Sequence, residues 1–268
     1  MKNLNTIIII LGIYLISQAV GLYVGSEIIG EIQEGEIPAA VEQPESVWSS
    51  ATLFLYILII TAVLLIFIKF KYDFIIKALI VLAIFVSVSI TLFVFFGAKG
   101  ILISLALVVA SLFMKNYKYY GILKNSILIL AVAGVGGYLG ASLGIIPAIV
   151  FLIGLSIYDI VAVFGTKHMI TLAESGRGRF PFMFTIPFEG KGGDIEIGTG
   201  DFAIPIMFTV SILKDYEILA AGITALFGTL GFLALFYFLS QKERRALPAL
   251  PPICLSMLLG FGLCILLI

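Results

Sequence analysis

The sequence predicts an all-α, polytopic integral membrane protein with nine transmembrane helices, and three observations support this. Of its 268 residues, 61% are hydrophobic and only 12% are charged, with a mean hydropathy of +1.19. A soluble domain of this size could not bury so much apolar surface. The apolar residues are gathered in runs close to the length of about 20 residues that crosses a bilayer as a helix. The basic residues also fall mostly in every second connection between the runs, which places them on one side of the predicted membrane.

Nine apolar runs, in chain order, give the predicted spans. They occupy residues 6–24, 47–68, 74–96, 101–114, 126–144, 146–165, 197–213, 216–239 and 247–268. The first run follows a lysine, as the apolar part of a signal peptide does. It is longer than that part usually is, and no small-residue cleavage site follows it, so we expect it to remain a span. The fourth run is short and the fifth nearly joins the sixth, so the span number depends most on these two places.

The connections between the runs predict the orientation. With the N-terminus inside, 14 of the 16 lysines and arginines fall on the inner side, and only Lys99 and Lys214 fall outside. The first outer connection holds six glutamates, from Glu27 to Glu45, and no basic residue. Because inner connections of membrane proteins are enriched in lysine and arginine, we expect the N-terminus inside and the C-terminus outside. One span more or fewer would mix the two sides.

We expect three parts along the chain. Residues 1–165 are predicted to form a six-span bundle, residues 166–196 a mobile cytoplasmic loop, and residues 197–268 a C-terminal part of three spans. The loop contains an apolar patch at 180–188, which we expect to rest on the membrane interface. In the fifth span, Gly136, Gly140 and Gly144 recur at the spacing that lets neighbouring helices pack closely.

Two carboxyl groups fall inside predicted spans. Asp159 lies in the sixth span and Asp201 near the start of the seventh, and neither span holds a lysine or arginine. Carboxyl groups at membrane depth are costly and usually functional. Counted at helical rise, Asp159 lies about 12 Å from the inner boundary marked by Lys167, and Asp201 lies about 8–10 Å from that marked by Glu196 and Asp194. Two consecutive antiparallel spans therefore carry carboxyls at similar depth, where they could face each other.

A facing pair of carboxyls has the chemistry of an aspartic protease. Two adjacent carboxyls cannot both ionise cheaply, so they share one proton. The charged member takes a proton from water while the protonated member hydrogen-bonds the scissile carbonyl. Gly198 and Gly200, just before Asp201, have no Cβ and would let a substrate backbone approach. The alternative is a polar contact between helices in which protonated aspartates are merely hydrogen-bonded.

A proline-rich segment opens the last span, with the sequence Ala246-Leu247-Pro248-Ala249-Leu250-Pro251-Pro252. Proline lacks a backbone N–H and resists regular helix, so we expect this segment to be extended or kinked at the inner membrane edge. Prolines that simply open a helix are the alternative.

Three motifs together resemble those of the presenilin and signal peptide peptidase family of intramembrane aspartyl proteases. Tyr158-Asp159, Gly198-Thr199-Gly200-Asp201 and Pro248-Ala249-Leu250 are similar to its YD, GxGD and PAL motifs, in the expected order and in the sixth, seventh and ninth spans. The resemblance implies an aspartic endopeptidase that cuts within transmembrane segments, with Asp159 and Asp201 catalytic. It also implies that seven residues shape the site or bind substrate, namely Tyr158, Gly198, Thr199, Gly200, Pro248, Ala249 and Leu250. Thr199 stands where leucine is frequent in the family, which bears on substrate preference.

The resemblance also bears on cofactors, partners and location. It implies no cofactor and no metal, and the single histidine, His168, with two distant cysteines also makes a zinc site improbable. Cys254 and Cys264 are too far apart along one helix to form a disulfide. The substrates implied are single-span membrane proteins or peptides in the lipid bilayer, and the predicted orientation favours those with an outer N-terminus. The compact chain looks like a microbial, archaeal-type homologue in the cell membrane. We expect the protein to need no accessory subunit, and a homo-oligomer is an open alternative. Its zero net charge gives no sign of a nucleic-acid partner.

Three other interpretations were weighed. Type IV prepilin peptidases also use GxGD, but the PAL segment and nine spans speak against them. The sequence from Gly140 to Gly144 has the GxSxG form of serine hydrolases, but the sole histidine lies in a connection, so we interpret it as helix packing. A proton- or cation-coupled transporter or leak channel would also use intramembrane aspartates, although no inverted repeat is evident. Substituting either aspartate by asparagine distinguishes this last class, because proteolysis should vanish whereas a pore could survive.

Overall fold

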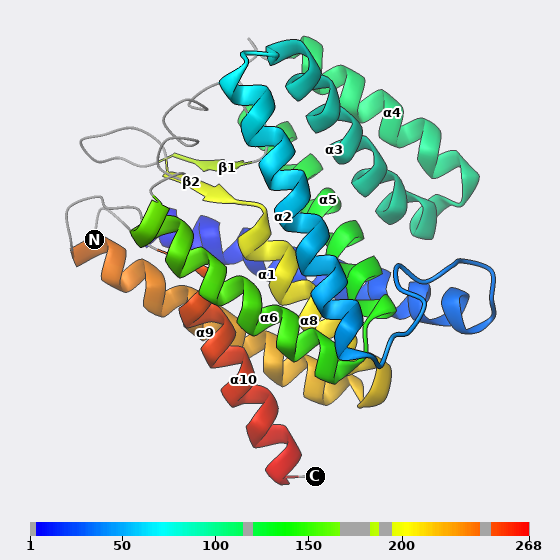
Figure 1. Ribbon diagram of the computed structural model, residues 1–268, viewed down its shortest axis with the longest axis vertical. Coiled ribbons are helices and arrows are strands. Elements are labelled where there is room, and N and C mark those ends of the chain that lie inside the picture. The colour runs from blue at the N-terminus through cyan, green and yellow to red at the C-terminus, as the bar shows by residue number, and fades with distance from the viewer. Residues whose placement is uncertain (1–3, 115–119, 167–182, 188–194, 242–247, 268) are drawn as a thin grey trace.

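The computed structural model describes residues 4–114, 120–166, 183–187, 195–241 and 248–267, and these residues are mostly helical (Figure 1). They form nine α-helices, a short π-helix (η1, Val161–Thr166) and a two-stranded sheet. The helices are α1 Leu4–Gln33, α2 Val47–Lys69, α3 Asp73–Phe96, α4 Ala98–Phe113, α5 Tyr120–Ser142, α6 Ile145–Ile160, α8 Gly200–Asp215, α9 Ile218–Gln241 and α10 Leu250–Leu267. Each predicted span corresponds to one of them, so the all-α prediction is confirmed.

Seven of these described helices are long and apolar enough to cross a membrane. One of the seven is α6, counted with the start of η1 over Ile145–Phe164, whereas α4 and α8 have 16 residues each and no such extension. The number of nine spans therefore stays a prediction, as does the orientation of the termini.

The first helix is longer than predicted. It runs to Gln33 and includes Glu27 and Glu31, which we had placed in the outer connection. The cause is a continued apolar face, because Val24 is 0% exposed and Ile28 1% exposed. Glu27 is exposed, whereas Glu31 lies on the same face as Val24 and Ile28 and is partly buried.

A hairpin that the sequence analysis missed lies before α8. Strand β1 (Met183–Ile186) pairs antiparallel with β2 (Ile195–Gly198), and Phe184 lies opposite Ile197. The predicted seventh helix began at residue 197, but α8 begins at Gly200. The difference has a physical reason, since glycine favours neither helix nor strand and the pairing with β1 decides the conformation of 195–198.

The apolar patch at 180–188 was expected on the membrane interface, and for Phe184 and Ile186 this is wrong. Phe184 and Ile186 are fully buried in the core, because a strand directs alternate side chains to one face. The remaining parts of the predicted loop, residues 167–182 and 188–194, lie outside the described residues, and so does its predicted mobility.

Helix α5 packs closely against α8 through its glycines. A Cβ on Gly136 would lie 2.7 Å from the carbonyl oxygen of Ala203, and one on Gly140 would contact the carbonyl oxygen of Met207. The close approach predicted from the glycine spacing is therefore confirmed at these two positions. At Gly144 the neighbour is the side chain of Glu45, not another helix.

Contacts at the two ends of the bundle show how the helices alternate in direction. At one end the connection after α1 meets the end of α5, where the Tyr138 hydroxyl donates to the carbonyl of Pro38 over 2.9 Å. At the same end Lys214 Nζ of α8 lies 3.7 Å from Glu45 Oε1. At the opposite end the Thr6 hydroxyl of α1 donates to the carbonyl of Pro187, just after β1 (3.2 Å). The start of α1 and the hairpin thus share the end at which α8 begins.

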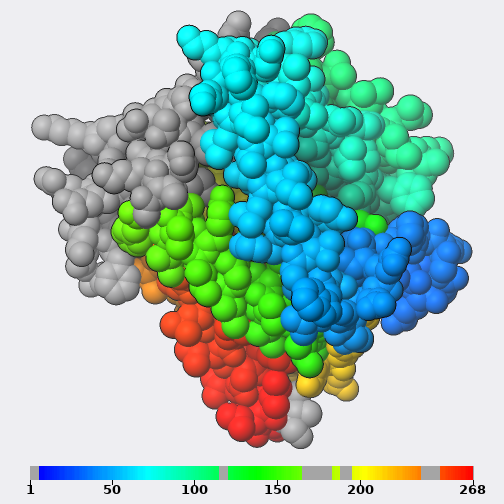
Figure 2. Space-filling view, in the orientation of Figure 1, coloured from blue at the N-terminus to red at the C-terminus, as the bar shows by residue number. Residues whose placement is uncertain are grey.

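Helix α2 lies on the outside of the bundle and covers part of α6 (Figure 2). Its 18-residue apolar window has a mean hydropathy of 2.9, and none of it is buried inside the protein. Such a surface is stable only in an apolar solvent, so we expect α2 to face lipid.

Candidate active site

Asp159 lies near the end of α6, two residues before the π-helix η1 begins. Its side chain is 7% exposed, and its Oδ2 accepts a hydrogen bond of 3.2 Å from the backbone N–H of Leu250. The backbone N–H of Ala249 interacts with the same carboxyl. These donors stand at the first turn of α10, where N–H groups have no partner within the helix and the helix dipole is positive.

The proline-rich segment makes these donors available. Pro248 is not helical, Ala249 lies in a bend, and α10 begins at Leu250 with Pro251 and Pro252 in its first turn. The alternative in which prolines open a helix is therefore correct for Pro251 and Pro252, and the extended part ends at Ala249. Because proline has no N–H, the donors left at this helix start are those of Ala249 and Leu250.

Asp201 lies in the first turn of α8 and is partly exposed. The next residue, Phe202, is fully buried. Its ring centroid lies 4.4 Å from that of Phe184, 5.4 Å from that of Phe232 and 5.7 Å from that of Tyr14. This aromatic cluster joins β1, α9 and α1 to the start of α8, and so holds the backbone from which the Asp201 carboxyl projects.

The two glycines of Gly198-Thr199-Gly200-Asp201 differ in their surroundings. A Cβ on Gly198 would lie 3.4 Å from Oδ2 of Asp201, whereas one on Gly200 would meet no atom within 4 Å. Gly198, the last residue of β2, therefore lies beside the carboxyl, and Gly200 faces open space. Thr199 precedes α8 and makes no side-chain hydrogen bond that caps the helix.

The structure brings the two aspartates together. Helix α6 packs against α8, and α10 packs against both. The carboxyls of Asp159 and Asp201 lie near enough to interact electrostatically, and Cys254 of α10 lies near both. Cys254 is buried and free, as is Cys264, so the expectation of no disulfide is confirmed. Two carboxyls so placed would share one proton.

Tyr158 is directed elsewhere. Its ring makes an edge-to-face contact with Phe54 of α2, with centroids 6.2 Å apart and an interplanar angle of 84°. The residue therefore joins α6 to α2, while its neighbour Asp159 interacts with α8 and α10.

Sequence reasoning missed three residues that hold the hairpin: Lys124, Asn125 and Thr185. The side chains of Lys124 and Asn125, in the second turn of α5, hydrogen-bond Thr185 of β1. The predicted fifth span began at residue 126, so both were placed in a connection. The signal available in the sequence was that Lys124 and Asn125 are polar residues directly before an apolar run.

Comparison with known proteins agrees with this site. A sequence model of the family "Signal-peptide peptidase, presenilin aspartyl protease" matches residues 10–268. The fold is similar to two solved structures described as a presenilin family intramembrane aspartate protease, in space groups C222 and P2. The first has a TM-score of 0.66 and 23% identity, and the match covers 94% of each chain. The second has a TM-score of 0.66 and 25% identity, covering 96% of this chain and 97% of the other. A comparison with curated proteins gives no match.

A multi-pass helical membrane protein of this fold and family is an intramembrane aspartic peptidase. The chain belongs to the signal-peptide peptidase and presenilin family of aspartyl proteases. The resemblance carried by the three motifs is thereby confirmed.

Proposed function

We propose that this protein hydrolyses peptide bonds within the transmembrane segments of other membrane proteins, with Asp159 and Asp201 as its catalytic dyad. The observation that carries the proposal is the proximity of these two carboxyls, from the packed helices α6 and α8, with the Asp159 carboxyl bonded to the first turn of α10. Within the described residues, no group of three His, Cys, Asp or Glu side chains could hold a metal ion.

The dyad works by dividing one proton between two carboxyls. The charged aspartate takes a proton from the attacking water, while the protonated one donates a hydrogen bond to the scissile carbonyl. The proton then passes to the leaving amine. The N–H groups of Ala249 and Leu250 orient the Asp159 carboxyl during these steps. Because the fold holds these donors in place, they need not reorient during the reaction.

Substrate binds in extended form along β2, because one edge of β2 is unpaired among the residues that the structure describes. The N–H and C=O of Thr185 are bonded to the Asn125 side chain, so they point away from β2. Glu196 lies opposite Thr185, and Gly198 opposite Met183, so their backbone groups point away from β1. No backbone group of the described residues outside the sheet hydrogen-bonds them. The backbone N–H and C=O groups of an unwound substrate segment can form hydrogen bonds with this edge, which ends beside Asp201.

The remaining expectations form part of the same proposal. The enzyme lies in the cell membrane with its N-terminus inside, and it acts on single-span proteins whose N-termini lie outside. Its six-span part (1–165) supplies Asp159, and its three-span part (197–268) supplies Asp201 and the Pro248-Ala249-Leu250 segment. It needs no accessory subunit.

The test uses purified protein in liposomes with a single-span substrate whose N-terminus lies outside. Wild type, Asp159→Asn and Asp201→Asn are compared, and the products are identified by mass spectrometry. Asp215→Asn is the matched control, since Asp215 is exposed at the far end of α8. We expect cleavage within the span by wild type and the control alone. Equal cleavage by all four proteins would mean a contaminating protease.

Proton and cation flux is measured in the same liposomes. No cleavage by folded wild type, across several substrates and pH values, together with ion flux, would favour the transporter or leak channel instead. Flux is then expected to respond to the same two aspartates.

A further inference from the structure

The outer edge of β1 is closed by a side chain and not by a strand. Asn125 Nδ2 donates to the carbonyl oxygen of Thr185 over 2.9 Å, and Asn125 Oδ1 accepts from the N–H of Thr185 over 3.1 Å. A carboxamide presents a donor and an acceptor side by side, as a strand does at alternate residues. The Asn125 amide therefore occupies the place of a third strand, although it comes from a helix and lies 60 residues away in the sequence.

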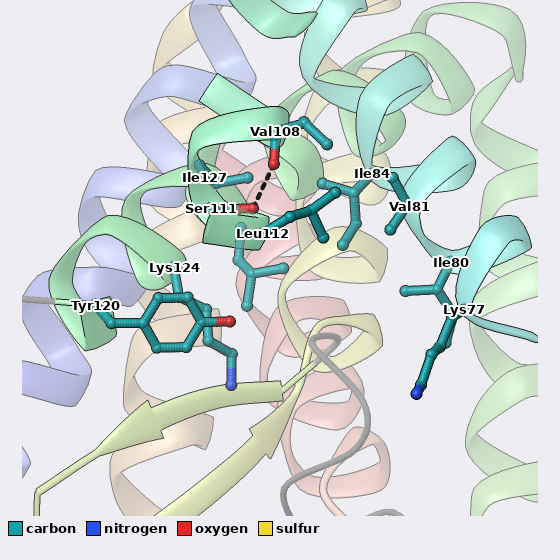
Figure 3. A pocket seen from close by; sticks show the side chains of 11 residues that line it. Lys77, Ile80, Val81, Ile84, Val108, Ser111, Leu112, Tyr120, Lys124 and Ile127 are labelled. Atoms are coloured by element: carbon teal, nitrogen blue, oxygen red, sulfur yellow. Dashed lines mark hydrogen bonds between the residues drawn. The ribbon is translucent and has the colours of Figure 1, made fainter. Parts of the chain in front are cut away.

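Lys124 strengthens the same attachment. Its Nζ donates to the Thr185 hydroxyl over 2.8 Å, and the carboxylate of Glu196 on β2 attracts it. Figure 3 shows the Lys124 side chain reaching from α5 toward the two strands, beside a small cavity between α3, α4 and α5. Thr185 thus forms three hydrogen bonds with two consecutive residues of α5, accepting two and donating one. Among the described residues, these are the only side-chain hydrogen bonds to either strand.

The hairpin transmits this attachment to the active site. Thr185 lies opposite Glu196 in the pair, and β2 ends at Gly198, three residues before Asp201. On its core face, β1 contributes Phe184 to the aromatic cluster around Phe202. The cluster sets how close β1 lies to α8, but apolar contacts permit sliding. The directional hydrogen bonds of Asn125 set its position along the strand direction.

We propose that Asn125 is a positioning residue for the protease, whose amide fixes the hairpin and thereby places Asp201 against Asp159 and the substrate edge of β2. This inference rests on the proposed function. Asn125 touches neither carboxyl, and it acts through β1 and β2. Without the amide, the edge of β1 is unpaired and the hairpin can shift, which moves Gly198 and the start of α8.

The first test compares Asn125→Ala with Ser126→Ala. Ser126 is the next residue and is exposed, so it is a matched control on the same helix. We expect Asn125→Ala to lower kcat about tenfold to a hundredfold, because misplacements near 1 Å cost reactions about that much. Ser126→Ala should retain the wild-type kcat. Asn125→Ala with the kcat of wild type would overturn the inference.

The second test uses Asn125→Asp and separates positioning from folding. A protonated carboxyl has one donor and one acceptor and restores both bonds to Thr185, whereas an ionised one sets an acceptor against the Thr185 carbonyl. We expect the ratio of the variant's kcat to that of wild type to rise about tenfold as pH falls, while the ratio for Asn125→Ala stays constant. A ratio for Asn125→Asp that does not change with pH would overturn the inference, even if Asn125→Ala fails to fold.

The outcomes separate the two proposals. Wild type that cleaves no substrate overturns the proposed function and this inference with it. Wild type that cleaves, with variants that behave as wild type at every pH, overturns the role of Asn125 alone.

Discussion

The backbone N–H of Leu250 donates a 3.2 Å hydrogen bond to Oδ2 of Asp159, joining residues 91 positions apart in the chain. The bond explains why a proline-rich segment stands at the start of α10. Pro251 and Pro252 leave the first turn with few donors, and those of Ala249 and Leu250 are directed at one carboxyl. The segment therefore contacts Asp159 through its backbone.

We expect Leu250→Pro to impair cleavage more than Leu250→Ala does. Both substitutions shorten a buried side chain, but only proline removes the N–H, and proline is tolerated at the first residue of a helix. An unpaired buried acceptor costs about 1–3 kcal/mol, so the proline variant should be about five- to a hundredfold slower than the alanine variant. Initial rates in liposomes measure the difference, and equal rates would show that this bond does not matter to catalysis.

Gly198→Ala and Gly200→Ala should separate crowding of the site from helix stability. The new methyl at 198 would lie 3.4 Å from Oδ2 of Asp201, where water or the scissile carbonyl must approach, so we expect kcat/KM to fall about tenfold or more. The methyl at 200 meets no atom within 4 Å, so the unfolding temperature should stay the same or rise. Rates and thermal unfolding of both variants check this. A normal rate for Gly198→Ala would place the reaction on another side of Asp201.

Gly140→Ala is expected to destabilise the fold by about 1–3 kcal/mol, because its Cβ would contact the Met207 carbonyl and force α8 away from α5. Gly12→Ala is the matched control, since a Cβ there meets no atom within 4 Å. Unfolding of both variants in detergent gives the comparison. Similar stability in the two variants would contradict the close packing of α5 on α8.

The predicted orientation can be tested with Glu42→Cys and Lys69→Cys, which place exposed thiols at opposite ends of α2. Cys254 and Cys264 are buried, so the unmodified protein should label poorly. A membrane-impermeant thiol reagent should label Glu42→Cys in intact cells and Lys69→Cys only after permeabilisation. The reverse pattern would invert the orientation and the expected substrate class.

Much of the fold was predictable because a helix in a membrane is a local property. Residues 74–96 were predicted as a span, and α3 covers Asp73–Phe96. A run of apolar side chains lowers the free energy of insertion wherever its neighbours lie. The hairpin was not predictable in the same way. Each strand has only four residues, and Ile195 to Gly198 become a strand through pairing with β1.

The residues of the site likewise differ in whether the sequence alone could identify them. Asp159 and Asp201 were identifiable from sequence because a carboxyl within an apolar span is costly whatever surrounds it. Asn125 was not identifiable, because a polar residue beside a span boundary is ordinary in sequence. Its role depends on Thr185, which only the fold places opposite it.

The sequence by itself determined that this chain is a multi-pass membrane protein and predicted two carboxyls within its spans, because transfer free energies add along the chain. Only the tertiary structure decided that the carboxyls meet. The rotation of α8 about its axis depends on packing, through Gly136 and Gly140 on α5 and Phe202 in its aromatic cluster. The same packing brings the first turn of α10 to Asp159, a contact between distant residues that no local pattern specifies.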